Sequence, residues 1–359
     1  RHKTLQPPST TPSVHPHPHL SSRLPLLITG VSGVAGWNAF PYFRRRHSGQ
    51  VVGIRPTATW QLTTDDVIGL DTEDRAGLLA LFEKHRFRSV LNCTGNCALK
   101  SCELDPAMAQ RTNVDSAANI AEVSHRFGAR LVHLSSDLVY SGKGRGGYVE
   151  TDPVDPVTVY GRTMAEGERV VREIDSAAAI LRISLPMGPS FNRHAGAIDW
   201  IQSRFRHGRP ATLYFDEVRS CTYTDDLNRV FERFLAGGQA GLFHCGGPRP
   251  ITLYQIAQIV NRVGGYDPRL LKGCPRIEAG PLPPRAGNVS MNSGKLIAAL
   301  GGEPFRPWPV GEELFPMDRQ WHFMRPGDEP GGLEWLAARL YRYPKLMGTA
   351  RMLKDIDGI

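Results

Sequence analysis

Two hydroxyl side chains are spaced so that they could act together on a carbonyl group. Ser136 ends an apolar run, and Tyr160 begins a segment with helical periodicity 24 residues later. A tyrosine can give a proton to a carbonyl oxygen that is receiving a hydride, while a serine hydroxyl orients that same oxygen. Asp137 follows the serine directly. The sequence therefore predicts a catalytic group made of Ser136, Tyr160 and Asp137.

The fourth residue after Tyr160 is Met164. Because residues four apart share a helix face, a lysine here would reach both the phenol and the ribose of a bound nucleotide. A cation ~4 Å away could favour the tyrosinate by up to about 4 kcal/mol at an effective dielectric constant of about 20. Without it, Tyr160 is expected to stay protonated at neutral pH and to be a poor base. Lys100 is a candidate substitute cation, and a solvated surface lysine is the alternative interpretation.

A glycine-rich turn, Gly30-x2-Gly33-x2-Gly36, follows the first apolar run and opens the first helical segment. Glycines at this spacing allow a tight turn and leave helix N-terminal amides facing a pyrophosphate. The sequence therefore predicts a dinucleotide cofactor at this turn. The residues expected to line it are Gly30, Ser32, Gly33, Val34, Ala35 and Gly36.

Arg55 ends the second apolar run, where NAD enzymes usually carry an acid for the ribose hydroxyls. No acid lies nearby, and a planar guanidinium can bond two oxygens of a 2′-phosphate. We therefore expect NADP(H) rather than NAD(H) as the cofactor, with an exposed arginine that binds nothing as the alternative. Further cofactor contacts are expected at the ends of the third and fourth strands and at the catalytic tyrosine, from Asp71, Thr72, Cys93, Thr94, Gly95 and Tyr160.

These residues are positioned by short apolar runs that alternate with helical segments. The runs are 26–29, 51–54, 89–92, 130–134, 179–183 and 241–245, and the helical segments lie near 34–46, 74–86, 106–127, 157–174, 224–236 and 252–263. Strands that are apolar throughout are buried on both faces, which indicates a parallel sheet covered by helices. The expected fold class is α/β, a Rossmann-type doubly wound parallel sheet with a smaller α/β substrate-binding domain.

Changes in composition divide the chain into predicted regions. The first residues are rich in proline, serine, threonine and histidine, so they have little to bury and should be disordered. After about residue 185, proline and glycine become more frequent and the alternation less regular. The predicted regions are a disordered tail (1–23), a cofactor domain (24–185 and about 218–247), a substrate domain (about 186–217 and 248–315) and a C-terminal helical extension (316–359).

The charges and cysteines exclude several classes of protein. Residues 1–64 contain seven basic residues and no acid, whereas the rest of the chain has 36 basic and 35 acidic residues. A near-neutral body lacks the electrostatic footprint of a nucleic-acid-binding protein. No apolar run approaches the ~18 residues of a membrane helix, and the six cysteines fit neither a disulfide framework nor a usual metal site. We expect a cytoplasmic protein without metal, nucleic-acid or membrane partners.

From about residue 25 to 315 the sequence resembles the dTDP-4-dehydrorhamnose reductase branch of the extended short-chain dehydrogenases/reductases. The segments that carry the resemblance are His133–Tyr140, Tyr160–Glu168, Leu181–Ser184 and Ser220–Leu227. The resemblance implies an NADPH-dependent reductase of a 4-keto sugar nucleotide, with Ser136 and Tyr160 as catalytic residues. It also places Asn96, Arg219 and Arg285 near the substrate, where the arginines could meet a diphosphate.

The chain departs from this family at identifiable positions. Met164 stands where the family has a lysine, and residues 92–96 and 185–187 differ from segments that line the family's substrate cleft. Leu138 stands where 4,6-dehydratases of the superfamily need a glutamate, which argues against dehydration. The superfamily also includes a non-catalytic regulatory subunit of methionine adenosyltransferase. The alternatives to a reductase are therefore an NADP(H)-binding regulatory subunit and a sugar-nucleotide epimerase, acting as a homodimer or with a larger enzyme partner.

Overall fold

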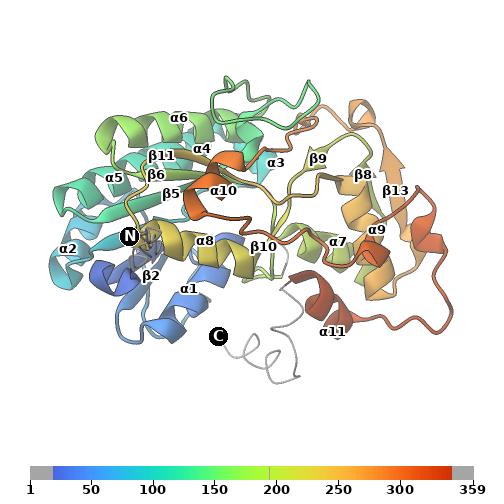
Figure 1. Cartoon of the computed structure of the whole chain (residues 1–359), viewed down its shortest axis with the longest axis horizontal. Coiled ribbons are helices and arrows are strands. Elements are labelled where there is room, and N and C mark those ends of the chain that lie inside the picture. Colours follow the sequence, from blue (N-terminus) through green and yellow to red (C-terminus); the bar gives the residue numbers. More distant parts are fainter. Residues whose placement is uncertain (1–18, 194, 342–359) are drawn as a thin grey trace, which may run out of the picture.

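Seven parallel strands form the central sheet of the computed structural model, which describes residues 19–193 and 195–341 (Figure 1). The strand order is β11-β6-β5-β4-β1-β2-β3. The bounds are β1 Leu26–Thr29, β2 Val51–Arg55, β3 Val67–Gly69, β4 Ser89–Asn92, β5 Arg130–Ser136, β6 Ala179–Ile183 and β11 Gly241–Cys245. The predicted doubly wound α/β fold is confirmed.

Helices cover both faces of this sheet because the strands are apolar on both sides. Leu26 and Ile28 of β1 pack in one cluster with residues of α1 and α8, whereas Leu27 packs in another with residues of α2 and α5. Figure 1 shows α1 and α8 on one side of the sheet and α5 and α6 on the other. The helix bounds are α1 Val34–Arg46, α2 Arg75–His85, α5 Ser116–Arg126, α6 Val159–Ile174 and α8 Thr224–Ala236.

The helix that the sequence predicts over 106–127 is divided into three parts. A short helix α4 (Pro106–Gln110) is followed by one π-helical turn (Arg111–Asp115) and then by α5. Asp105 caps α4, since its side chain accepts from the Met108 N–H at 2.9 Å. Single π turns inside helices often mark functional sites. Here the turn carries Asn113, which contacts the loop after β4 and helix α6.

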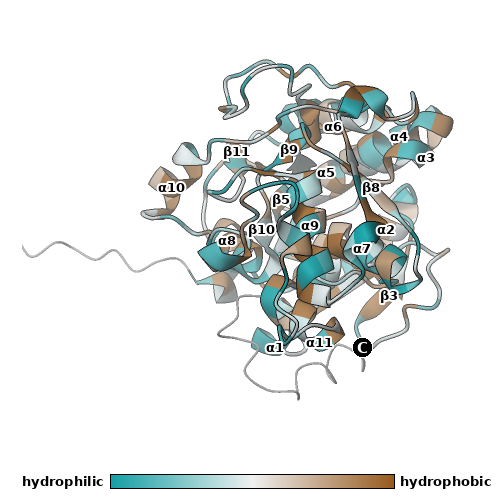
Figure 2. Ribbon diagram, turned by 90° about the vertical axis from the view of Figure 1, so that its right-hand side faces the viewer, coloured by the Kyte–Doolittle hydropathy of each residue, from teal (hydrophilic) through white to brown (hydrophobic). Residues whose placement is uncertain are grey.

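A second apolar cluster lies beside the sheet. It is built from α7 (Ala197–Arg206), α9 (Leu253–Gly264) and the strand pair β8 (Ala211–Tyr214) and β13 (Leu271–Cys274), and α7 carries both hydrophilic and hydrophobic residues (Figure 2). The remaining elements are β7 Pro186–Met187, β9 Val218–Arg219, β10 Thr222–Tyr223, β12 Ile251–Thr252, α3 Leu99–Leu104 and α10 Gly294–Leu300. The domain boundaries given above stay a prediction.

The C-terminal segment packs on this second cluster. Trp308 is fully buried, and its indole Nε1 donates to the Leu340 carbonyl at 2.8 Å. Trp321 is also buried, whereas Trp335 is partly exposed. The described part of the predicted helical extension contains a 3-10 helix at Trp321–Phe323 and a continuous helical segment made of α11 (Leu333–Leu336) and a π-helical turn (Ala337–Tyr341). The rest, from residue 342, lies outside the described residues.

The N-terminal boundary differs from the prediction of a disordered segment over 1–23. Leu20–Arg23 form a 3-10 helix, and Leu20 is buried in the cluster that contains α1 and α8. The ordered part of the chain therefore begins earlier than predicted, because Leu20 packs into this apolar cluster. Residues 1–18 lie outside the described part of the chain. Within the described ranges, no helix is long and apolar enough to cross a membrane.

Candidate active site and cofactor cleft

The candidate site lies at the carboxyl edge of the sheet, where the strand order reverses. Strand β1 lies between β2 and β4, so the chain winds away from it in both directions. In open α/β sheets ligands bind outside the carboxyl ends of the strands at this point. The predicted cofactor residues fall at these strand ends, and Ser136 ends β5.

The glycine-rich turn is shaped by close contacts within the backbone. Gly30 has a φ of +65°, and a Cβ there would lie 2.4 Å from the Cys93 carbonyl oxygen. A Cβ on Gly36 would lie 2.2 Å from the Gly30 carbonyl oxygen. Gly33 is different, because it is exposed and a Cβ there would lie in ordinary contact with the Gly30 carbonyl oxygen, at 3.5 Å. The first and third glycines thus serve packing, and the second leaves open space at the N-terminus of α1, beside Ser32, Val34 and Ala35.

The end of β2 carries Arg55, whose guanidinium is held by its own loop. Its Nε donates to the Leu62 carbonyl at 2.7 Å and its Nη1 to the Pro56 carbonyl at 3.0 Å. Asp71, after β3, accepts both the backbone N–H and the hydroxyl of Thr57. The predicted cofactor residues Arg55 and Asp71 therefore belong to adjoining loops.

Thr72 points away from this surface. It is buried, and its hydroxyl donates to the Ser116 hydroxyl at 2.8 Å on α5. Asn119 of the same helix donates to the Thr72 carbonyl at 3.1 Å. The side chain of Thr72 thus anchors the loop after β3, and the backbone is what it can offer a nucleotide.

The loop after β4 approaches the glycine-rich turn and the π-helical turn. The Cys93 N–H donates to the Thr29 hydroxyl at 3.1 Å, and the Asn96 N–H donates to Asn113 Oδ1 at 2.7 Å. The Thr94 hydroxyl is buried and has no hydrogen-bond partner among the described residues. An unpartnered buried hydroxyl is costly, and a cofactor crossing this strand end would satisfy it. The predicted Asn96 has its Oδ1 engaged by the Ala98 N–H at 2.9 Å.

Ser136 and Tyr160 come together as the sequence predicts. Helix α6 begins just after Thr158, whose hydroxyl accepts from the Gly161 N–H at 2.9 Å, so Tyr160 sits in its first turn. Burial raises the pKa of Tyr160 well above its usual value, and a hydrogen bond with Ser136 acts in the opposite direction. The phenol is therefore a proton donor next to the serine hydroxyl at neutral pH.

The position on helix α6 where the family has a lysine holds Met164, and Arg219 is a nearby cation that acts to lower the pKa of Tyr160. Met164 is buried in an apolar cluster with Tyr160 and Leu138, and its sulfur lies 3.9 Å from where a Cβ on Gly95 would be. Lys100 lies on α3 and is exposed, and it forms no ion pair in the described part of the chain. Its proposed role as a substitute has no contact in this structure to support it.

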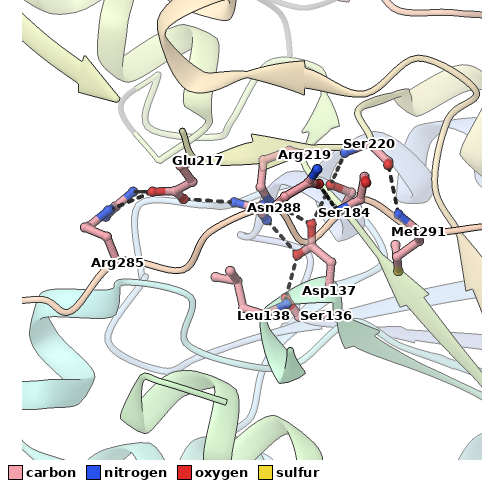
Figure 3. A network of polar contacts seen from close by, with 11 residues as sticks. Ser136, Asp137, Leu138, Ser184, Glu217, Arg219, Ser220, Arg285, Asn288 and Met291 are labelled. Atoms are coloured by element: carbon pink, nitrogen blue, oxygen red, sulfur yellow. Dashed lines mark hydrogen bonds and ion pairs between the residues drawn. The ribbon is translucent and has the colours of Figure 1, made fainter. Parts of the chain in front are cut away.

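Asp137 is held by a buried guanidinium (Figure 3). Arg219 donates from Nε and Nη2 to the two Asp137 oxygens, each at 2.7 Å, and Ser184 donates to Oδ2 at 2.6 Å. The carboxylate lies 3.2 Å from the Ser136 hydroxyl, which also accepts from the Leu138 N–H at 3.1 Å. Asp137 therefore orients the serine through a fixed carboxylate. Its ion pair with Arg219 joins the end of β5 to β9.

The second predicted substrate arginine is also paired. Arg285 donates to Glu217 Oε2 from Nε at 2.8 Å and forms an ion pair from Nη2 at 2.6 Å. Glu217 is buried, and burial raises its pKa while both arginines oppose the rise. Figure 3 shows Arg285, Glu217, Arg219 and Asp137 as a row of alternating charges. A diphosphate would have to compete with these carboxylates for either guanidinium.

Sequence reasoning missed four residues of this region, namely Thr57, Asn113, Ser184 and Glu217. Glu217 had a signal, since it stands two positions before Arg219 and an acid so placed can pair with it. Asn113 had none, because helical periodicity does not reveal a π turn. Among the described residues, no group of three or more His, Cys, Asp or Glu side chains could hold a metal ion.

Comparison with known proteins identifies a family that the chain matches over most of its length. Residues 24–313 match the model of a family described as the RmlD substrate binding domain. A dTDP-4-keto-6-deoxy-D-glucose reductase of Streptomyces niveus is 27% identical over 298 residues, which cover 81% of this chain and 96% of that protein. The methionine adenosyltransferase 2 subunit beta of Rattus norvegicus is 26% identical over 310 residues, covering 82% and 89%.

Solved structures share the fold. A dTDP-4-dehydrorhamnose reductase of Bacillus anthracis in complex with NADP superposes with a TM-score of 0.69 at 19% identity, covering 79% of this chain and 95% of that one. A UDP-glucose 4-epimerase of Thermus thermophilus in complex with NAD gives 0.69 at 22% identity, covering 85% and 99%. At these identities the likeness concerns the fold alone.

Proposed function

The chain belongs to the RmlD substrate-binding domain family, and from that premise we propose that it is an NADP(H)-dependent reductase of a keto sugar linked to a nucleotide. The observation that carries the proposal is the pairing of Ser136 with a protonated Tyr160 at the carboxyl edge of the sheet. A relative in the same family is named as a dTDP-4-keto-6-deoxy-D-glucose reductase.

The glycine-rich turn and its neighbours fit a dinucleotide. Gly33 leaves open space at the N-terminus of α1, where backbone N–H groups favour a pyrophosphate. The Thr94 hydroxyl is an unpartnered buried group at the end of β4. Arg55 offers a cation at the end of β2, which suits a 2′-phosphate. The bound cofactor would supply a hydride to the carbonyl carbon of the substrate.

The protein's own residues would then handle the oxygen. The Ser136 hydroxyl, which gives its one proton to Asp137 in this structure, would turn that proton to the carbonyl oxygen and fix its position. As the carbon accepts the hydride, the Tyr160 hydroxyl gives its proton to the oxygen, so the ketone becomes an alcohol and the phenolate regains a proton from solvent. Asp137, which Arg219 keeps in place, holds the serine hydroxyl until that exchange of partners.

Replacement of Tyr160 tests the proposal. Tyr160→Phe removes the proton donor and should lower kcat with a dTDP-linked 4-keto-6-deoxy sugar by about 10²–10⁴-fold. The variant should still bind NADPH, as measured by calorimetry. NADPH oxidation is followed by loss of the absorbance of the reduced nicotinamide. If the parent protein binds NADPH and oxidises none with any keto-sugar nucleotide, the reductase proposal is wrong.

A regulatory role is the second candidate, and two observations favour it. Met164 removes the cation beside Tyr160, and both predicted substrate arginines are paired with carboxylates. A relative of similar identity is named as a methionine adenosyltransferase subunit. In that case the protein would bind NADP(H) and a larger enzyme, and co-purification with a stable partner would distinguish it. The third candidate, an epimerase, needs Tyr160 as a base, which its raised pKa opposes.

A further inference from the structure

The Asp71 carboxylate accepts hydrogen bonds from two groups of Thr57, in the loop after Arg55. The Thr57 N–H donates to Asp71 Oδ1 at 2.9 Å, and the Thr57 hydroxyl donates to Oδ2 at 2.6 Å. Thr57 follows β2 and Asp71 follows β3, and these strands are neighbours in the sheet. An N–H and an O–H that point at the two oxygens of one anion form a small anion-binding site. Asp71 supplies the anion in this structure.

The Arg55 guanidinium lies in the same loop and retains free donors. Two of its five N–H groups donate to the carbonyls of Leu62 and Pro56, which leaves three without a protein partner in the described ranges. Gly69 makes room for it, because a Cβ there would lie only 2.8 Å from Arg55 Nη1. Arg55 and Asp71 form no ion pair with each other in that part of the chain. The loop therefore presents a cation and an occupied anion site close together in sequence.

We propose that the 2′-phosphate of NADP(H) competes with the Asp71 carboxylate for the two Thr57 donors, and that the cofactor binds by displacing this carboxylate. The proposal rests on the proposed function, since it requires NADP(H) as the cofactor. The phosphate would accept from the Thr57 N–H and hydroxyl and would also pair with Arg55, which Asp71 does not do. Asp71 is thus a specificity-determining residue that competes with the phosphate for Thr57.

The proposal predicts opposite effects of two substitutions on one ratio. The ratio is the affinity for adenosine 2′,5′-bisphosphate divided by the affinity for adenosine 5′-monophosphate, each measured by calorimetry on the full chain. Asp71→Asn removes the competing charge and should raise the ratio by about three- to tenfold. Thr57→Val removes a donor from the phosphate site and should lower it by a similar factor. Because both ligands share the adenosine and its 5′-phosphate, a change in contacts to those parts cancels from the ratio.

Glu73→Gln is the matched control for charge. Glu73 is exposed and lies two residues after Asp71, but it does not contact Thr57. Its substitution by glutamine removes one negative charge, as Asp71→Asn does. It should leave the ratio unchanged, and thermal unfolding of each variant checks that it is folded.

Three outcomes overturn the proposal. If Asp71→Asn and Thr57→Val both lower the ratio, the carboxylate only holds the loop in shape. If Asp71→Asn leaves the ratio where Glu73→Gln leaves it, Asp71 does not compete with the phosphate. In both of these cases the proposed reductase function still stands, provided that the parent protein binds NADPH. If the parent binds neither adenosine ligand nor NADPH, the proposed function and this inference fail together.

Discussion

The environment of Tyr160 favours one protonation state. Burial raises its pKa, and the helix position that would carry a compensating cation holds Met164. The neutral phenol carries the proton that reduction needs, although its raised pKa makes it a weaker acid, whereas alcohol oxidation needs the phenolate. We therefore expect reduction to be insensitive to pH through the neutral range, and oxidation to increase only at a pH above the ordinary tyrosine value of about 10.

Met164→Lys tests how the absence of a cation at this position affects cofactor binding and turnover. The new ammonium would lie four residues from Tyr160 on the same helix face and should stabilise the phenolate. We expect tighter NADPH binding and faster turnover of a keto-sugar nucleotide, with alcohol oxidation shifted to lower pH. The cofactor-free variant should lose about 1–3 kcal/mol of stability, because a charge enters an apolar cluster.

Met164→Leu is the matched control, since it preserves an apolar side chain of similar size. It should change neither NADPH affinity nor turnover by more than about twofold. If Met164→Lys still binds NADPH but gains no activity over Met164→Leu with any keto-sugar nucleotide, the regulatory role becomes the better explanation.

Some residues of the candidate site follow from the sequence and others do not. Ser136 and Tyr160 are placed by strand ends and helix starts, which local patterns reveal. The role expected of Arg219 depends on a partner 82 residues earlier, Asp137, and local patterns carry no information about that pairing. Because charges buried in proteins are normally paired, a buried arginine in such a site has to find a carboxylate. Sequence spacing does not say which one.

Helix α6 is fixed to the sheet by a buried ion pair. Arg182 of β6 donates to Glu168 from Nε at 2.8 Å and from Nη2 at 2.7 Å. Ser135 of β5 donates to the same carboxylate at 2.5 Å, and its neighbour Ser136 belongs to the catalytic pair. The contact therefore sets the position of the helix that carries Tyr160 relative to the strand that carries Ser136.

Breaking the ion pair between Arg182 and Glu168 should lower the stability of the protein. Glu168→Gln leaves the Arg182 guanidinium buried without its counter-charge, and we expect the free energy of unfolding to fall by about 3–5 kcal/mol. Glu166→Gln is the control, because Glu166 pairs with Arg169 on the exposed side of the same helix and should cost at most about 1 kcal/mol. Denaturant unfolding measures both. Equal losses in the two variants would show that the buried pair does not anchor the helix.

Strand β5 carries a histidine that resists protonation. Burial lowers the pKa of His133 to about 4, and its Nδ1 faces the Asn92 side-chain amide nitrogen at 3.0 Å. That nitrogen is a donor, since the Asn92 oxygen already accepts from the Thr29 hydroxyl. The ring must therefore be neutral, with its proton on Nε2.

The stability of the protein should fall in acid because of His133. Unfolded histidine titrates near 6.5, so the unfolded state takes up a proton that the folded state refuses. Stability is complete above about pH 6.5 and declines as the pH falls toward 4, by up to about 3 kcal/mol from this group. His133→Leu should reduce that slope in denaturant unfolding at several pH values, while His207→Gln, an exposed histidine, should not. An unchanged slope in His133→Leu would contradict the assignment.

Element boundaries were predictable where one helix face is continuous. The bounds expected at 34–46 and 224–236 agree with α1 and α8. The segment 106–127 also reads as one amphipathic helix, yet it contains a π turn. An extra residue in one turn changes periodicity too little to be noticed, and the turn carries Asn113, which contacts the Asn96 N–H and the Thr163 hydroxyl.

At the scale of the whole molecule, the polar network at the site connects its two main bodies. Asp137 belongs to the sheet side, whereas Glu217, Arg219 and Arg285 come from segments near the second apolar cluster (Figures 1 and 3). The ion pair between Asp137 and Arg219 is buried, so it fixes the end of β5 against β9. The division into two domains stays a prediction from composition, and local sequence patterns do not reveal the network because it depends on contacts distant in sequence.

The N-terminal anchor of the folded body gives a final prediction. Removing residues 1–18 should leave the free energy of unfolding unchanged, since their composition offers little to bury. Removing residues 1–23 also deletes Leu20, which is 4% exposed, and the Arg23 carbonyl that accepts from the Ser89 hydroxyl at 2.7 Å. We expect that deletion to cost about 2–5 kcal/mol, as for the loss of a buried leucine. Leu20→Ala in the full chain should reproduce most of this cost, because the packing of one side chain causes it. If both truncations unfold at the same denaturant concentration as the full chain, the Leu20 contact does not stabilise the body.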